Sequence, residues 1–261
     1  TFVRDFFNTG TTFQNGIAIS GGSKAIQNYL SYQNTTAKGI IPNNKFDKHN
    51  FSLRSTTALF DKFIEVDGSI ALTKQNIDNA PSAPGQYFNP IVGLYLFPQG
   101  TTEFNKYKET YEIANPARNG LMKQNWPHER DINKNPYWLI NRYNYSHEME
   151  KAIAKASVKF NFTDWLNLQF RGSYDKTNTV SERKVHSGIE TVAGPGGRYD
   201  LYTVNNAQAY GDILLSLSKQ ISDFSVNATL GSSINDSKIF SIDNTLGDLV
   251  IPNLFDLRNY T

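Results

Sequence analysis

The chain has 261 residues, which is enough for one large domain or two small ones. Its 26 basic and 24 acidic side chains nearly balance, so a net charge of +2 gives no electrostatic footprint for nucleic acid. The absence of cysteine excludes a disulfide scaffold, a thiolate zinc site and a cysteine nucleophile.

The first half of the chain contains four stretches in which apolar and polar residues alternate. Three are short, at 17–19, 26–32 and 51–53, and the fourth covers 64–73. Successive side chains point to opposite faces in an extended chain, so alternation with a period of two is typical of a half-buried β-strand. We expect one strand at each stretch.

The second half repeats the pattern over longer stretches, at 152–162, 166–174, 212–218 and 224–231. Thr163 and Asp164 form a tight turn between the first two, so this pair is predicted to be a β-hairpin. We therefore expect about eight strands, most near the roughly 9–11 residues with which a tilted strand crosses a bilayer. No long amphipathic helix interrupts them.

The predicted connections alternate strictly between short and long. The short ones are 21–24, 60–62, 163–164 and 219–223, and the long ones are about 34–46, 77–150 and 177–207. Outer-membrane barrels combine tight periplasmic turns with extended outer loops, whereas a soluble β-sandwich mixes loop lengths less regularly. The predicted fold class is therefore all-β, an antiparallel transmembrane β-barrel. A secreted soluble β-sandwich that binds carbohydrate is the alternative, and a surface adhesin or structural barrel is a third possibility.

A barrel predicts which way each side chain points. One set of alternate residues is apolar and is expected to face outer-membrane lipid, and the other set is expected to face the lumen. The lipid-facing set is Val158, Phe160, Phe162, Leu166, Leu168, Phe170, Ile213, Leu215, Leu217, Val226 and Leu230. The lumen-facing set is Lys159, Asn161, Gln169, Arg171, Ser216 and Asn227.

Several motifs, in order, resemble the barrel of SusC/RagA-like TonB-dependent outer-membrane transporters. The resemblance covers essentially the whole chain, 1–261, and rests on several ordered motifs rather than on one. They are Asp5-Phe6-Phe7-Asn8-Thr9-Gly10, Asn15 to Ser23, Tyr29 to Tyr32, Lys38 to Asn44, Phe51 to Arg54, Asn135-Pro136-Tyr137-Trp138, Phe162 to Leu166, and Val250 to Phe255.

The resemblance implies a 22-stranded barrel with an internal plug, of which this chain would supply about eight strands. It also implies import of a glycan or peptide across the bacterial outer membrane, powered by the TonB complex and assisted by a SusD-like surface lipoprotein. The plug and the closing strands would lie outside this chain. An isolated piece of barrel cannot close, so we expect a curved partial wall.

The aromatic residues of the predicted 77–150 loop are the candidate ligand contacts, because aromatic rings pack against sugar C–H surfaces. The candidates are Tyr95, Trp126, Tyr137, Trp138 and Tyr145. The alternative is that these rings form the loop's own small core. Trp165 lies beside a short turn and is expected to belong to the aromatic girdle at the membrane interface.

Signals for catalysis are weak. Ser181-Glu182-Arg183-Lys184 matches Ser-x-x-Lys, but the companion motifs of that enzyme class are missing. The four histidines lie far apart, and His147-Glu148 lacks the second histidine of a zinc-protease motif. We expect no enzymatic activity, no metal and no cofactor.

Overall fold

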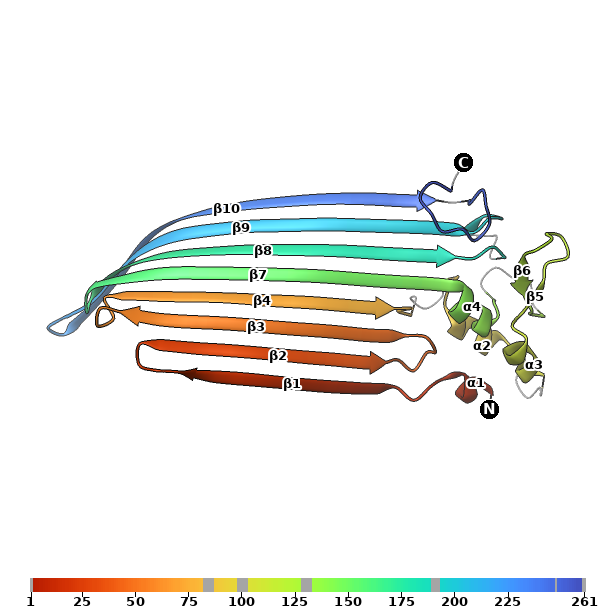
Figure 1. Ribbon diagram of the computed structural model, residues 1–261, viewed down its shortest axis with the longest axis horizontal. Helices are drawn as coiled ribbons and strands as arrows, with labels where there is room; N and C mark the ends of the chain where they lie inside the picture. Colours follow the sequence, from red (N-terminus) through yellow and green to blue (C-terminus); the bar gives the residue numbers. More distant parts are fainter. Residues whose placement is uncertain are drawn as a thin grey trace.

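A computed structural model describes residues 2–81, 87–97, 103–127, 133–188, 193–246 and 248–259. Its main feature is one antiparallel sheet of eight strands, in the order β1-β2-β3-β4-β7-β8-β9-β10 (Figure 1). The strands are β1 (Thr11–Gly22), β2 (Ile26–Lys38), β3 (Lys45–Leu59), β4 (Ile64–Asp78), β7 (Tyr143–Thr163), β8 (Leu166–Val185), β9 (Arg198–Ile221) and β10 (Phe224–Leu246). The eight strands predicted from alternation are confirmed.

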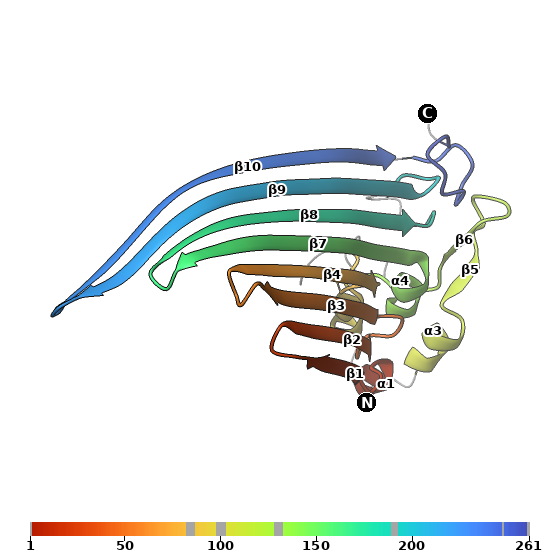
Figure 2. The same cartoon turned by 60° about the vertical axis from the view of Figure 1, so that its left-hand side comes forward.

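The sheet is an open, curved wall. Strands β1 and β10 lie at its two edges, and Figures 1 and 2 show the wall bending along the long strands β7 to β10. This is the partial β-barrel that we expected.

The strands are longer than the alternation indicated, from 12 residues in β1 to 24 in β9. The connections predicted at 34–46 and 177–207 therefore shrink to 39–44 and 186–197, and the longest one covers 79–142 instead of 77–150. The added residues, such as those from Asn178 to Val185, are polar or mixed. Backbone hydrogen bonds to a neighbouring strand can continue whether the side chains are polar or apolar. The hydropathy pattern therefore did not predict these ends of the strands.

The register places the predicted apolar and polar sets on opposite faces. Phe160 on β7 lies opposite Leu168 on β8, which lies opposite Leu215 on β9. One position along, Lys159 lies opposite Gln169. We call the side that carries Phe160, Leu168 and Leu215 the apolar face, and the other side the polar face. Phe162 falls within a register shift at the end of β7.

The four hairpin turns lie at one end of the sheet, and each reaches further along the strands than the one before (Figure 1). The first residue of β2, Ile26, pairs with Thr57, and β3 continues two residues further to Leu59. The first residue of β8, Leu166, pairs with Leu217, and β9 continues four residues further to Ile221. Such a stagger is the shear of a barrel whose strands tilt against its axis.

The opposite end of the sheet carries four short helices and a small hairpin (Figures 1 and 2). The helices are α1 (Phe2–Phe6), α2 (Pro90–Leu96), α3 (Phe104–Glu109) and α4 (Pro136–Arg142), and the hairpin joins β5 (Glu112–Ala114) to β6 (Met122–Gln124). Within the described ranges, every helix falls short of the length and apolar content that a transmembrane helix needs.

Candidate functional site: the loop-covered end of the sheet

The long connection between β4 and β7 folds around Asn135. This residue is fully buried and caps α4, because its Oδ1 accepts hydrogen bonds from the backbone N–H groups of Tyr137 (2.9 Å) and Trp138 (3.4 Å). Its Nδ2 donates to the carbonyl oxygens of Tyr107 and Asn125, both at 2.9 Å. One side chain therefore joins α3, the segment after β6 and the start of α4.

Most aromatic side chains of this connection form a core of their own. Trp126 lies at ring-centroid distances of 5.2 Å from Phe97 and 5.4 Å from Tyr107. Tyr137 lies 5.3 Å from Phe6 of α1. The burial of Trp126 and Tyr137 gives both residues a packing role in this structure, which is the alternative that the sequence left open.

Trp138 belongs to a second buried cluster with Leu139, Val185 and Ala193. It is only 1% exposed. Val185 is the last residue of β8, so this cluster fastens α4 to the end of the sheet. A direct contact between the Trp138 ring and a ligand is not supported by this arrangement.

The remaining two aromatic candidates are placed differently. Tyr95 lies on α2 with 68% of its surface exposed. Tyr145 lies on β7 and lines a polar pocket of about 300 Å³ at the rim of the sheet, together with Lys45 and Glu182. The structure does not bring the five candidates together at one site, and ligand binding by any of them stays a prediction.

Three contacts tie the loops to one another. Arg142 donates two hydrogen bonds to the carboxylate of Glu112, at 2.7 and 2.6 Å, which joins α4 to the β5–β6 hairpin. Arg118 in that hairpin donates to the carbonyl oxygen of Pro195 in the next connection. The hydrogen bonds to the Glu112 carboxylate also raise the pKa of the Arg142 guanidinium, so Arg142 stays charged over the whole physiological range.

His186 contacts two other segments of the loop-covered end, at Arg142 and Phe255. Its ring Nδ1 lies 2.9 Å from the carbonyl oxygen of Arg142, and its ring packs edge-on against Phe255 at 4.9 Å. Burial lowers the pKa of His186 below its ordinary 6.5, although the hydrogen bond to Arg142 partly opposes this. The folded protein therefore prefers the neutral imidazole.

A pH titration tests whether the buried His186 ring is neutral in the folded protein. Because its pKa is lower in the folded protein, His186 binds fewer protons in the folded state than in the unfolded state. The contribution of His186 to the free energy of unfolding is therefore complete above pH 6.5. It is lost as the pH falls from 6.5 through the lower pKa of the folded state. NMR titration of the His186 ring should give a midpoint below 6.5, and His186→Asn should remove this part of the pH dependence. A midpoint above 6.5 would contradict the burial argument.

The polar face carries ion pairs between neighbouring strands. Arg171 on β8 donates to Asp212 on β9 at 2.9 and 2.6 Å, and the Tyr210 hydroxyl donates to the same carboxylate at 2.7 Å. Arg54 on β3 donates to Asp67 on β4 at 2.9 Å. Lys155 and Lys159 of β7 also point to this face and have no partner within the described residues. The face is thus charged and rich in hydrogen-bonding groups.

The Ser-x-x-Lys motif cannot act as a nucleophile and base here. Ser181 and Lys184 lie three residues apart on the strand β8, so their side chains point to opposite faces. Of the histidines, His128 lies outside the described residues. Across the described ranges, no three His, Asp or Glu side chains come close enough together to hold a metal ion.

Asn135 lies within one of the sequence motifs, but its role as the residue that joins the loops was missed from the sequence. A signal for it existed, because Asn followed by Pro is the N-cap and first position of a helix. The same pair, Asn89-Pro90, begins α2. Hydropathy cannot reveal that the Asn135 amide also joins two other elements.

Comparisons with known proteins identify the fold. No protein-family model matches the chain. No curated protein matches it.

The RagAB peptide importer in the closed-closed state is 14% identical with a TM-score of 0.69, over 99% of this chain and 28% of that chain. The RagAB peptide transporter is 15% identical with a TM-score of 0.66, over 96% of this chain and 27% of that chain. The open-open state of the importer is 15% identical with a TM-score of 0.66, over 98% of this chain and 27% of that chain. This chain therefore spans about a quarter of their length, and the likeness shows that it has the fold of part of an antiparallel β-barrel.

Proposed function

We propose that this chain forms part of the wall of a TonB-dependent importer in the bacterial outer membrane. The observation that carries the proposal is a single sheet with one apolar and one polar face, short turns at one end and folded loops at the other. A sandwich would bury the apolar face under a second sheet. In the part of the chain that the structure describes, the one further sheet is the small β5–β6 hairpin.

The apolar face would contact lipid, and the polar face would line the lumen and meet the plug. An apolar band of a membrane barrel is about 25 Å tall, whereas the 24 residues of β9 extend roughly 80 Å along the strand. The wall would therefore rise beyond the bilayer on the loop side. Trp165 would sit at the inner interface, where Lys219 lies 4.5 Å from its ring centroid.

The loop-covered end would face the outside, where a SusD-like lipoprotein and the cargo approach. The cargo would be a peptide or a glycan, and the similar structures, which are peptide importers, favour a peptide. Tyr95 and Tyr145 are the two aromatic candidates left to contact it, since Trp126, Tyr137 and Trp138 are packed. TonB would act through the plug, and no part of the proposal requires catalysis or a cofactor.

Removing part of the loop tests the proposal. Deleting Glu103 to Asn125 from the full-length protein removes α3 and the β5–β6 hairpin but no residue of the eight-stranded sheet. Uptake of fluorescent peptides, or of oligosaccharides if peptides are not taken up, should fall strongly while the barrel remains inserted and heat-modifiable. Unchanged uptake of every cargo that the parent protein imports would contradict a role of this loop in transport.

The same loop tests the orientation. Asn119 and Gly120 are exposed at the tip of the β5–β6 hairpin. An epitope inserted between them should bind antibody on intact cells that lack the partner lipoprotein. An epitope that becomes accessible only after the cells are permeabilised would reverse the proposed topology.

A further inference from the structure

A groove of about 370 Å³ crosses the apolar face where its side chains change from apolar to polar. Its apolar side is formed by Phe51, Leu72 and Ala152, which lie side by side on β3, β4 and β7. In the adjacent row, His49, Lys74 and Glu150 occupy the same three strands. Tyr32, Lys176 and Asn178 complete the lining on the apolar face.

Three of these polar side chains lie at the same height above the hairpin turns. His49 lies ten residues from the end of β3 at Leu59. Lys74 and Lys176 lie ten residues from the starts of β4 and β8 at Ile64 and Leu166. Ten residues of a strand tilted by roughly 40° rise about 25 Å, which is the height of a barrel's apolar band. In the proposed membrane placement, these three side chains would therefore lie at the loop-side boundary of the hydrocarbon.

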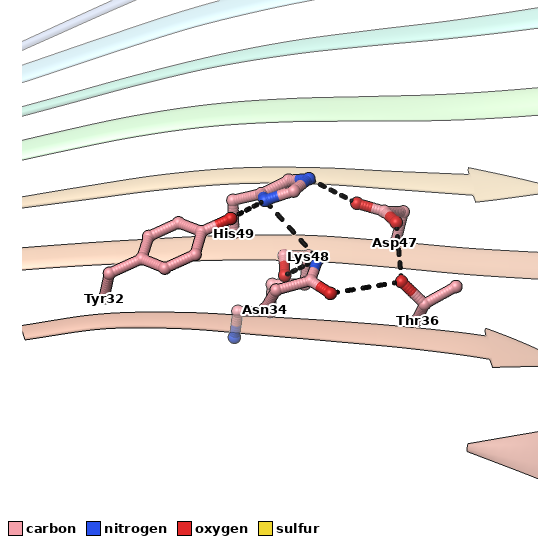
Figure 3. Close-up of polar contacts among 6 residues, drawn as sticks. All are labelled: Tyr32, Asn34, Thr36, Asp47, Lys48 and His49. Atoms are coloured by element: carbon pink, nitrogen blue, oxygen red, sulfur yellow. Dashed lines mark hydrogen bonds and ion pairs between the residues drawn. The ribbon is translucent and has the colours of Figure 1, made fainter. Parts of the chain in front are cut away.

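Two residues of the groove lining, His49 and Tyr32, are held in place by hydrogen bonds (Figure 3). Nε2 of His49 lies 2.6 Å from the Asp47 carboxylate, and Nδ1 lies 2.7 Å from the Tyr32 hydroxyl. With the Nε2 proton donated to Asp47, Nδ1 accepts the hydroxyl proton of Tyr32. Thr36 also donates to Asp47, at 2.9 Å. The Asp47 carboxylate is thus engaged with His49 and Thr36, and Asp47 is not among the residues that line the groove.

The groove has an unbalanced positive charge. Lys74 pairs with Glu150 at 2.8 Å, so these two charges largely cancel. Lys151 also lines the groove, but its side chain pairs with Asp175 on the polar face at 3.0 Å. Lys176 has no hydrogen-bond or ion-pair partner within the described ranges. A lysine at a hydrocarbon boundary extends its ammonium group toward the headgroups.

We propose that this groove binds the phosphate headgroup of an anionic lipid in the outer leaflet. Lys176 and Lys74 would contact the phosphate, and an acyl chain would lie along Phe51 and Leu72. The inference rests on the proposed placement of the apolar face in lipid, but not on the identity of the cargo. Free phosphate would leave the apolar side of the groove uncovered, and an amphiphile matches both sides.

Native mass spectrometry of the full-length protein tests this assignment. The protein is released from nanodiscs of phosphatidylcholine that contain lipid A as the anionic probe, and retained lipid A is counted. Each lysine near a charged surface contributes about a fivefold change in affinity, so Lys176→Gln should reduce retention by about that factor. Lys74→Gln should reduce it at least as much, because the freed Glu150 would repel phosphate.

Lys155→Gln is the matched control. Lys155 is also an unpaired lysine in the middle of a neighbouring strand, but it lies on the polar face. Its replacement should leave lipid A retention unchanged. Equal losses for Lys155→Gln and Lys176→Gln, no loss for either, or displacement of lipid A by inorganic phosphate would each overturn the proposal.

A second readout separates this inference from the proposed membrane placement. These 261 residues contain no cysteine, so, once any cysteine elsewhere in the full-length protein is replaced, a fluorophore attached through Leu168→Cys or Gln169→Cys reports on one face alone. Brominated lipid should quench the label at 168 and not at 169. If that contrast holds while retention is insensitive to Lys176, only the headgroup site is wrong. If the contrast fails, the proposed placement of the apolar face in lipid fails with it.

Discussion

Expressed without further strands, residues 1–261 should not give a monodisperse, heat-modifiable monomer in detergent. Strands β1 and β10 are unpaired at the two edges of the sheet. About half of the 23 residues of β10 direct backbone N–H and C=O groups outward. In hydrocarbon each unsatisfied group costs several kcal/mol, so an open wall is not viable there.

In water the same segment should aggregate. Apolar side chains along the edges are largely exposed, with Leu230 and Ile234 on β10 both at 74% and Ile17 on β1 at 63%. Unpaired edges and exposed apolar side chains recruit other chains. Size-exclusion chromatography in detergent and gel mobility with and without heating are the measurements. A single monomeric species that shifts on heating would show that eight strands close by themselves.

Val158→Arg should destabilise the full-length barrel by about 2–4 kcal/mol, because it places a charge near the middle of the proposed lipid-facing band. Val158 lies five residues from the end of β7 and opposite both Phe170 and Val66. Leu168→Arg should cost less, because Leu168 lies only two residues from the start of β8 and thus closer to the membrane boundary.

Ser216→Arg is the control at the same height. Ser216 lies five residues from the end of β9, on the polar face, between the neutral residues Asn167 and Thr229. Its replacement should cost less than about 1 kcal/mol. Equilibrium unfolding in urea from detergent or lipid vesicles measures all three variants. Equal losses for Val158→Arg and Ser216→Arg would show that the apolar face does not contact lipid.

The strands and their faces were predictable from the sequence. Whether a residue such as Phe160 or Lys159 faces one side or the other depends only on its parity within a strand, which is a local property of the extended chain. The number of strands follows from the same alternation. The ends of the strands were not predictable, because above the apolar band neither face has to be apolar and only pairing with a neighbour decides where a ladder stops.

The tertiary structure alone decided two further features. The sequence does not say whether Trp126 and Trp138 are exposed or buried, and only the tertiary structure shows that they pack in clusters with Phe97 and Val185. The groove beside His49 and Lys176 likewise has no motif, because its residues come from separate strands that only the register of the sheet brings together. Side-chain direction is encoded locally, whereas height and burial depend on the register between strands that are distant in the sequence.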